Sequence, residues 1–189
     1  ERGGPAAAMC PRSGVGSMRE STLWSRATAC GERGPAGGGR GSRGGDAALI
    51  AERLGDEHLR IFDTAVMFKK VEHGLVANSS IETYKEAHIP GAAFADVLGD
   101  WNNPETPYRN VLSIDDLQKK LGEIGINEKS EVVVYSSTML MWATRAWWCL
   151  RYAGVENVRI LNGSFGAWQK AGLEVESGDN HYPPDSSTS

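Results

Sequence analysis

Apolar residues become periodic from residue 46 onward, whereas residues 1–45 are rich in Gly and Arg and show no apolar period. The pattern predicts a disordered Gly/Arg-rich tail over residues 1–45 and a folded domain over residues 46–177. Residues 178–189 contain two consecutive prolines followed by Ser and Thr, which is typical of an exposed linker. The middle segment is long enough to bury a core of its own.

The folded segment alternates between helical and extended patterns. We expect helices over residues 46–54, 113–125, 142–153 and 164–172, and strands over 58–63, 91–96, 131–135 and 158–161. A short hairpin within 67–76 and a helical turn within 81–87 complete the pattern. The run Glu131-Val-Val-Val-Tyr135 is apolar on both faces, as in a central parallel strand. The alternation predicts an α/β fold with a central parallel sheet and helices on both faces.

Two of the expected helices carry specific end signals. Asp46 is the expected N-cap of the first, with Leu49, Ile50 and Leu54 facing inward. Ser113 is the expected N-cap of the helix at 113–125.

Charge divides at the same boundary as the apolar pattern. The tail carries a net charge of about +4 and the remaining residues carry about −8, which together give the whole chain its net charge of −4. An acidic domain argues against nucleic acid as its partner, because phosphate binding needs a basic face. A Gly-rich tail with scattered Arg is more often solvated than a binding arm.

The cysteine pattern and the apolar runs limit the class of protein further. Cys10, Cys30 and Cys149 have no CxxC spacing, which argues against a disulfide scaffold, a zinc site or another metal centre. No apolar run approaches the length of a membrane span, and no cofactor motif stands in a credible context. We therefore expect a cytoplasmic protein without membrane contact. The Arg- and Ser-rich tail leaves a mitochondrial location as the alternative.

The candidate site is the loop that follows the most buried strand. In a parallel sheet, ligands bind beyond the carboxyl ends of the strands, near helix N-termini. This places the site at Ser136, Ser137, Thr138, Met139, Leu140 and Met141. Backbone N–H groups in such a loop, ahead of a helix, are suited to holding a small anion.

Four stretches of the chain resemble the rhodanese (thiosulfate/3-mercaptopyruvate sulfurtransferase) family, in the family's own order. They are Tyr84–Ala92, which contains His-Ile-Pro-Gly, Glu131–Tyr135, Met141–Trp148, and Val158–Trp168. The resemblance spans residues 47–177 and implies the rhodanese fold. It also implies the family's activity, in which a loop cysteine takes sulfane sulfur as a persulfide and passes it to a thiophilic acceptor.

The position that matches this cysteine holds Ser136, or at most its neighbour Ser137. A hydroxyl is too weakly acidic to replace a thiolate and forms no persulfide. Cys149 is the one cysteine of the expected domain, and it lies within an apolar helix, where cysteine is usually an inert core residue. We therefore assign no catalytic residue. Because the loop amides are expected to be in place, Ser136→Cys is expected to install a thiol that forms a persulfide.

Three further polar residues are candidates for anion binding or for structural roles. His88 more often holds a turn like His-Ile-Pro-Gly through a backbone hydrogen bond than it acts in catalysis. Asp63, at a strand end, either faces the loop or caps a turn. Arg145 either binds an anionic substrate or pairs with an acid such as Asp63 or Asp96.

A dual-specificity phosphatase would need Cys-x5-Arg on this loop, and the positions hold Ser136 and Trp142 instead. The resemblance is closest to the inactive first domain of tandem sulfurtransferases, which implies a catalytic rhodanese domain as partner. A free-standing binding module and residual sulfur transfer by another thiol are the alternatives.

Overall fold

The computed structural model describes residues 45–106 and 110–185 of the 189-residue chain. Its helices are α1 (Gly45–Ala51), α2 (Ile81–Glu86), α3 (Ile114–Glu123), α4 (Leu140–Tyr152) and α5 (Ser164–Lys170). Its strands are β1 (Leu59–Asp63), β2 (Val66–Val71), β3 (Gly74–Ser79), β4 (Ala93–Phe94), β5 (Glu131–Tyr135) and β6 (Val158–Ile160). Apart from Gly45, the tail expected over residues 1–45 lies outside the described residues.

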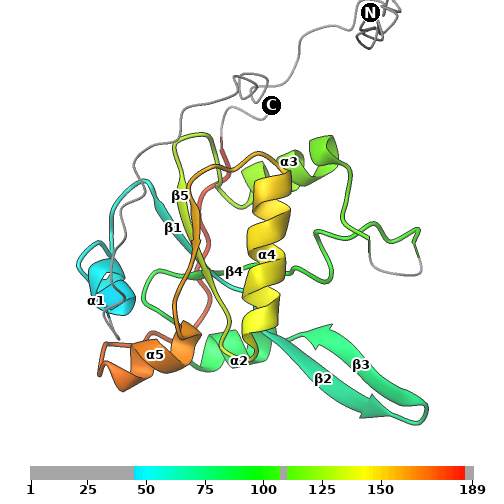
Figure 1. Ribbon diagram of the computed structural model, residues 1–189, viewed down its shortest axis with the longest axis horizontal. Coiled ribbons are helices and arrows are strands. Elements are labelled where there is room, and N and C mark those ends of the chain that lie inside the picture. Colours follow the sequence, from blue (N-terminus) through cyan, green and yellow to red (C-terminus); the bar gives the residue numbers. More distant parts are fainter. Residues whose placement is uncertain (1–44, 107–109, 186–189) are drawn as a thin grey trace, which may run out of the picture. The chain divides into compact units, whose positions relative to one another are not determined.

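Four strands form a parallel sheet in the order β4-β1-β5-β6 (Figure 1). β1 and β5 are the inner strands, as the apolar run of β5 predicts, and their register sets Asp63 opposite Tyr135. β2 and β3 pair separately as an antiparallel hairpin, which includes the segment 67–76 where one was expected and extends to residues 66 and 79. The predicted α/β fold with a central parallel sheet is confirmed.

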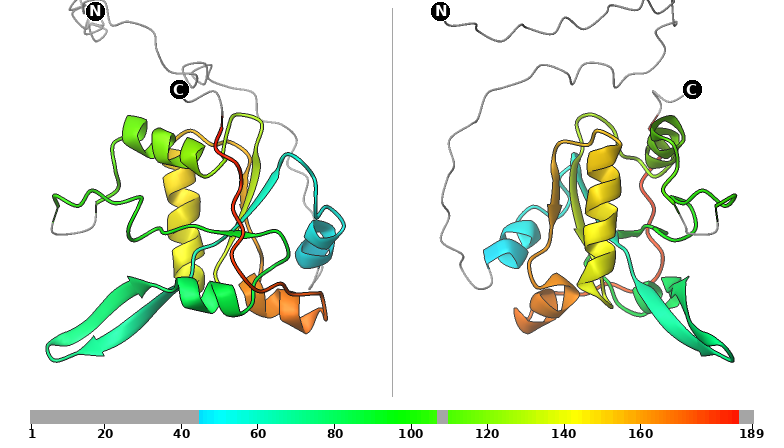
Figure 2. Two further views of the ribbon diagram at one scale, coloured as in Figure 1. Left: turned by 180° about the vertical axis from the view of Figure 1, so that it is seen from behind. Right: turned by 45° about the vertical axis from the view of Figure 1, so that its right-hand side comes forward.

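Helices cover the sheet on both faces. The right-hand view of Figure 2 shows α1 and α5 on one side of the sheet and α4 on the other. Because side chains alternate along a strand, Val133 and Tyr135 face α1 and α5, while Val132 and Val134 face α4. This two-sided burial explains why β5 is apolar without interruption.

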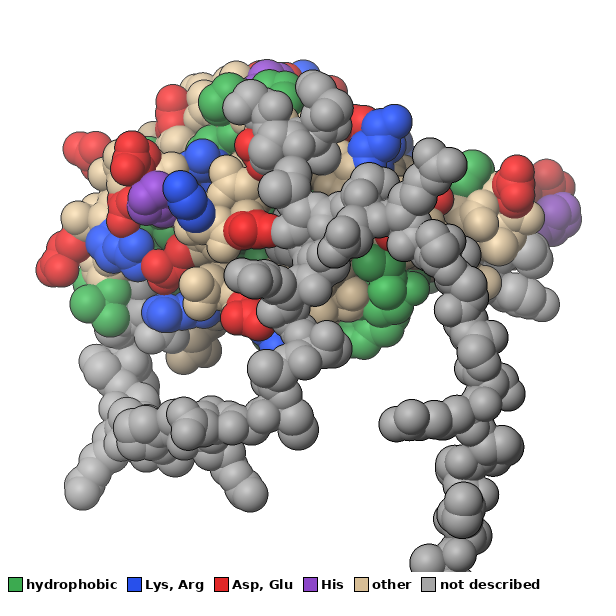
Figure 3. All heavy atoms as spheres, turned by 90° about the horizontal axis from the view of Figure 1, so that it is seen from above, with side chains coloured by type: hydrophobic (Ala, Val, Ile, Leu, Met, Phe, Trp, Pro, Cys, Tyr) green, Lys and Arg blue, Asp and Glu red, His purple; other side chains and the backbone are tan. Residues whose placement is uncertain are grey.

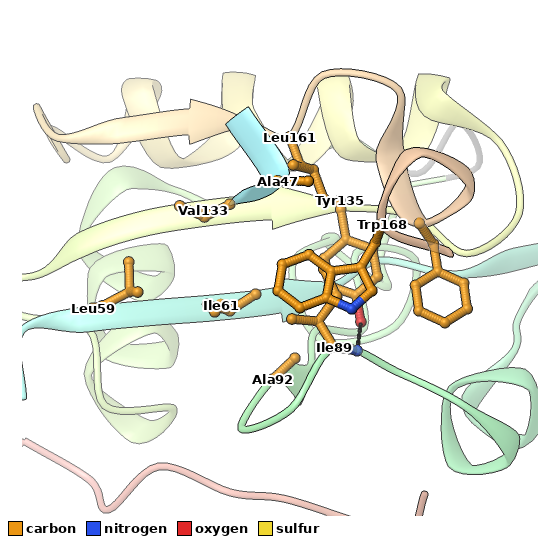
Figure 4. Close-up of a cluster of buried hydrophobic side chains, with 10 residues drawn as sticks. Ala47, Leu59, Ile61, Ile89, Ala92, Val133, Tyr135, Leu161 and Trp168 are labelled. Carbon is orange, nitrogen blue, oxygen red and sulfur yellow. Dashed lines mark hydrogen bonds between the residues drawn. The ribbon is translucent and has the colours of Figure 1, made fainter. Parts of the chain in front are cut away.

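The core beneath α1 and α5 joins apolar side chains from both helices and both inner strands (Figure 4). Its aromatic members also satisfy their polar atoms. The Tyr135 hydroxyl accepts a hydrogen bond from the Ile89 N–H at 3.1 Å, and the Trp168 indole donates to the Glu174 carbonyl at 2.7 Å. Buried Tyr and Trp side chains usually find such partners, and here they tie two loops to the core.

The inward face of α1 differs from the expected one at one position. Ala47, Ile50 and Leu54 pack on the core, but the Leu49 side chain is 61% exposed. Positions 47, 50 and 54 follow the 3.6-residue helical period, and Leu49 lies off that stripe. α1 also begins at Gly45, so Asp46 lies within the helix rather than at its N-cap.

The helix that precedes β5 in the sequence begins after a polar residue, and the helix that follows β5 begins after an apolar one. Ser113 caps α3 as expected, because its hydroxyl accepts the Asp116 N–H at 3.2 Å. α4 begins at Leu140, two residues before the expected start at Trp142. Leu and Met are strong helix formers, so the helix extends back into the predicted loop and shortens it to Ser136–Met139.

Residues 174–185, here called the C-terminal strap, run across the domain after α5, as the left-hand view of Figure 2 shows in red. Glu176 forms an isolated antiparallel bridge with His88. The Tyr182 hydroxyl accepts from the Ile61 N–H at 3.0 Å and donates to the Gly91 carbonyl at 2.7 Å. Part of the segment expected to be linker-like, residues 178–185, is therefore packed against the fold.

In the described part of the chain, no helix has both the length and the apolar character needed to cross a bilayer. Acidic and basic side chains are interspersed among the coloured residues on the face shown in Figure 3. On that face the described charges form no single block of one sign.

Candidate functional site

Ser136 occupies the first position beyond β5, at the carboxyl edge of the sheet, and is almost fully buried. Its neighbours in space come from the ends of adjacent strands. Asp63 ends β1, and Ser164 begins α5 shortly after β6. The parallel topology therefore brings three strand ends together around one buried serine.

Ser136 and Ser164 form a reciprocal pair. The Ser164 hydroxyl accepts the Ser136 N–H at 2.8 Å and donates to the Ser136 carbonyl at 2.7 Å. Ser164 has a φ of 55°, in the left-handed region that non-glycine residues rarely adopt, and follows Gly163 at 75°. The chain thus holds Ser164 in a costly backbone conformation that places its hydroxyl on the loop.

Thr138 joins the same loop to the start of the hairpin. Its hydroxyl donates to the Val66 carbonyl at 2.9 Å and accepts the Val66 N–H at 3.2 Å. The Thr138 N–H in turn donates to the Ser136 hydroxyl at 3.3 Å. The hydroxyl of Ser136 therefore serves the loop's own backbone.

Asp63 lies beneath the loop and is completely buried. One carboxyl oxygen accepts the Ser137 N–H at 3.1 Å, while the other oxygen and the Ser137 hydroxyl have no hydrogen-bond partner among the described atoms. Burial raises the pKa of Asp63 to about 6, against the lowering effect of the Ser137 hydrogen bond. The site thus combines a buried carboxyl group with hydroxyl groups.

This geometry limits what the loop can bind. The N–H groups of Ser136, Ser137 and Thr138 donate to Ser164, Asp63 and Ser136 respectively. A persulfide or an anion at this point would have to displace those intramolecular acceptors, and it would meet the Asp63 carboxyl group. The loop supplies hydroxyl and carboxyl groups but no thiol.

Met139, Leu140 and Met141 differ from the first half of the loop, because each side chain is about half exposed, at 48%, 50% and 53%. They present apolar surface beside the buried serine. Met141 lies within the first turn of α4.

Cys149 lies away from the loop. It is 1% exposed and sits nine residues after Leu140, roughly 13 Å along the helix. Burial raises the pKa of its thiol, and the nearby Arg145 charge opposes this effect. Both features disfavour the reactive thiolate.

Arg145 points toward the loop that follows β4. Its guanidinium donates to the Asn102 side-chain oxygen at 2.5 Å, and Asn102 donates to the Val97 carbonyl at 2.7 Å. Asp96, one of its two expected partners, accepts the N–H groups of Leu98 and Gly99. The other expected partner, Asp63, faces Ser137 as described above.

His88 is buried within the turn that its motif predicts. One ring nitrogen lies 2.8 Å from the Tyr84 carbonyl, and the other lies 3.1 Å from the Asn180 side-chain nitrogen. Its ring stacks on Tyr84 with centroids 4.2 Å apart. These contacts join α2 to the C-terminal strap, on elements other than the Ser136 loop.

Ser164 is not among the site residues that the sequence predicts, and the role of Thr138 in joining the loop to the hairpin was not predicted either. A signal for Ser164 was present: β5 and β6 are adjacent parallel strands, and residues just beyond adjacent strand ends meet at the same edge. Thr138 gave no such signal, since its partner Val66 belongs to an inserted hairpin. Within the described ranges, no group of three His, Cys, Asp or Glu residues is placed to hold a metal ion.

Comparison with known proteins gives consistent matches to one family. Residues 46–171 match the family model described as rhodanese-like domain. The 3-mercaptopyruvate sulfurtransferase of Escherichia coli K12 is 34% identical over 139 residues, which are 71% of this chain and 46% of that protein. A thiosulfate/3-mercaptopyruvate sulfurtransferase of Arabidopsis thaliana is 31% identical, over 68% of this chain and 36% of that protein.

Solved structures agree with these sequences. The crystal structure of a 3-mercaptopyruvate sulfotransferase from Escherichia coli matches with a TM-score of 0.64 and 30% identity, covering 74% of this chain and 52% of that one. A 3-mercaptopyruvate sulfurtransferase from Leishmania major matches with a TM-score of 0.59 and 27% identity, over 74% and 37%. This chain thus spans about half the length of such relatives or less, and by sequence and fold it belongs to the rhodanese-like domain family.

Proposed function

We propose that this rhodanese-like domain is the non-catalytic half of a tandem sulfurtransferase and supports a catalytic rhodanese domain through packing. The observation that carries the proposal is Ser136, which stands at the end of β5 where the family's persulfide cysteine belongs. In family chemistry a thiolate attacks the sulfane sulfur of thiosulfate, and sulfite leaves. A serine hydroxyl offers no thiolate for that attack.

The hydrogen bonds around Ser136 add to this argument. A catalytic loop directs its N–H groups at the reacting sulfur, whereas the N–H groups of Ser136 and Ser137 are bound by Ser164 and Asp63. The loop has become a packed structural element. The serine at the position of the nucleophile and the internally hydrogen-bonded loop both favour a non-catalytic role for this domain.

The partner is proposed from the relatives. The curated sulfurtransferases compared are at least twice as long as the matched segment, which covers 34–48% of them. A second rhodanese-like domain accounts for that difference in length. Sequencing the transcript beyond Ser189 tests this: a second domain with a loop cysteine is expected, and a stop codon at that point would contradict the tandem arrangement.

Activity of the chain alone is tested by cyanolysis of thiosulfate. The Cys10→Ser, Cys30→Ser variant removes the two tail thiols, so that Cys149 is the remaining thiol. We expect thiocyanate at the level of a protein-free blank. Turnover above the blank that disappears with Cys149→Ser would instead assign residual activity to that thiol.

A free-standing binding module is the second candidate, and the half-exposed Met139, Leu140 and Met141 side chains favour it. Adjacent exposed apolar residues next to a former active site are suited to contact with another protein. A defined partner whose binding is lost on Met139→Ser and Met141→Ser, in a chain shown to have no second domain, would favour this function over the first.

A further inference from the structure

A cavity of about 190 Å³ lies between α1 and the sheet, and its lining includes neither the Ser136 loop nor the hydrogen-bond partners of that loop. Leu59 and Glu131, the first residues of β1 and β5, line it, together with Leu49 and Ile50 of α1. Ligands of parallel α/β sheets usually bind at the carboxyl ends of the strands. This cavity is therefore separate from the site that the proposed function concerns.

The inner wall of the cavity is the hydrophobic core itself. Val133 and Leu161 form its floor, and both belong to the cluster beneath α1 and α5, where Figure 4 shows Val133 near Leu59 and Leu161 next to Ala47. Leu49, which lies off the packed stripe of α1, is the outer wall and remains 61% exposed. The apolar part of a ligand could therefore pack against the buried floor of the cavity and cover the exposed Leu49 side chain.

Two arginines lie at the mouth of the cavity, and they differ in how far their charges are already paired with carboxylates. Arg53 is committed, because its guanidinium donates to Glu131 at 2.9 Å and to Asp56 at 2.7 Å. Arg159 projects from β6 at the position that pairs with Val133, and its side chain is 73% exposed. Among the described residues, its ion-pair partner is Glu131 at 3.6 Å, beyond ordinary hydrogen-bond length.

The position of Arg159 favours an anionic ligand over a cationic one. Two guanidinium groups and one carboxylate line the cavity, but Arg53 is held by both Glu131 and Asp56, so Arg159 is the lining cation placed to meet an anionic head. An anionic head beside Arg159 would gain a charge-assisted hydrogen bond. A cationic head would gain no such bond and would lie beside the like charge of Arg159.

We propose that this cavity is a binding site for a small aliphatic carboxylate, with its chain on Leu49, Val133 and Leu161 and its carboxylate on the Arg159 guanidinium. The volume suits a short chain, since pockets for drug-sized ligands begin at about 300 Å³. The site is independent of the proposed tandem function. It requires neither the Ser136 loop nor a second domain.

Isothermal titration calorimetry of the full chain with octanoate tests the site, with octylammonium as the probe of opposite charge. We expect saturable binding of octanoate at one site, and about tenfold weaker binding by Arg159→Gln, as for loss of one charge-assisted hydrogen bond. Lys69→Gln on the exposed hairpin removes a charge elsewhere and should leave the affinity unchanged. Octylammonium should not compete.

NMR shifts of backbone amides locate the ligand. Changes centred on Ile50, Val133 and Leu161 are expected, and Leu49→Ala should weaken binding while Leu75→Ala, another strongly exposed leucine, should not. No saturable binding, equal effects of Arg159→Gln and Lys69→Gln, equal binding of octylammonium, or shifts centred elsewhere would each overturn the proposal. If no partner rhodanese domain were found, the proposal of a carboxylate site would be unaffected.

Discussion

Ser164 holds both backbone polar groups of Ser136, accepting its N–H at 2.8 Å and donating to its carbonyl at 2.7 Å. One hydroxyl thus ties the loop after β5 to the first turn of α5. In a buried setting such a pair is worth more than a surface hydrogen bond, because its loss leaves backbone groups unsatisfied.

Ser164→Ala removes this hydroxyl and leaves the Ser136 N–H and carbonyl without it. We expect the free energy of unfolding to fall by about 1–3 kcal/mol in urea titrations. Ser177→Ala, at an exposed position in the C-terminal strap, is the matched control and should change it little. Equal free energies of unfolding for the two variants would show that the Ser136–Ser164 hydrogen bonds do not stabilise the fold by this amount.

Asp63 gives the stability a characteristic dependence on pH. Its pKa is raised from 3.8 to about 6 by burial, so between these values the folded protein keeps a proton that the unfolded chain has lost. Binding more protons in the folded state means that this contribution to stability falls as the pH rises from about 4 to about 6. One pKa unit is worth about 1.4 kcal/mol, so the effect is of the order of 2–3 kcal/mol.

Asp63→Asn isolates that contribution, because asparagine keeps an oxygen for the Ser137 N–H and does not titrate. Unfolding free energies of both proteins should be measured from pH 4 to pH 7. We expect the wild type to lose stability relative to Asp63→Asn over this range. A difference that stays constant with pH would mean that the Asp63 pKa is not raised.

How far the sequence predicts this protein differs between fold and site. The unbroken run of β5 has one stable location, an inner strand of a two-sided sheet, so the layers follow from it, whereas the order of the four strands does not. Leu49 was misplaced because the apolar residues Leu49, Ile50 and Leu54 suggested a stripe that the helical period does not support. The site depends on contacts between strand ends far apart in sequence, and the buried hydroxyl network of Ser136, Thr138 and Ser164 leaves no periodic signal.

The C-terminal strap contributes to the fold through Tyr182. Its hydroxyl satisfies the Ile61 N–H on the side of β1 where the two-residue β4 does not reach, and its ring lies edge-on to Phe62. Tyr182→Phe should lower the free energy of unfolding by about 1 kcal/mol and speed hydrogen exchange of the Ile61 amide. Tyr152→Phe, at a more exposed ring on α4, is the control, and unchanged exchange at Ile61 would contradict the contact.

Cys149 should behave as a core residue toward thiol reagents. In the Cys10→Ser, Cys30→Ser variant, the native protein is expected to react slowly with a disulfide reagent at pH 8, because burial both blocks access and raises the thiol pKa. In urea the same thiol should react at the rate of a free cysteine. Fast labelling of the native state would contradict the buried placement and reopen a catalytic role for Cys149.

Ser136→Cys tests whether the loop retains more than the position of a sulfurtransferase site. The sequence alone suggested that a cysteine there would form a persulfide, but the structure directs the Ser136 and Ser137 N–H groups to Ser164 and Asp63. With those donors committed and the Asp63 carboxyl group close by, the new thiol should have a raised pKa and little access to thiosulfate.

We therefore expect no added sulfur by mass spectrometry after thiosulfate treatment of Ser136→Cys in a background lacking Cys10 and Cys30. Adding Ser164→Ala frees the N–H of residue 136, and Asp63→Asn removes the opposing charge, so the triple combination should form more adduct than Ser136→Cys alone. A full adduct on Ser136→Cys alone would mean that the serine is the single obstacle to persulfide formation. In that case the hydrogen bonds from the loop N–H groups to Ser164 and Asp63 would form only when residue 136 is a serine, and a cysteine there would open the loop to thiosulfate.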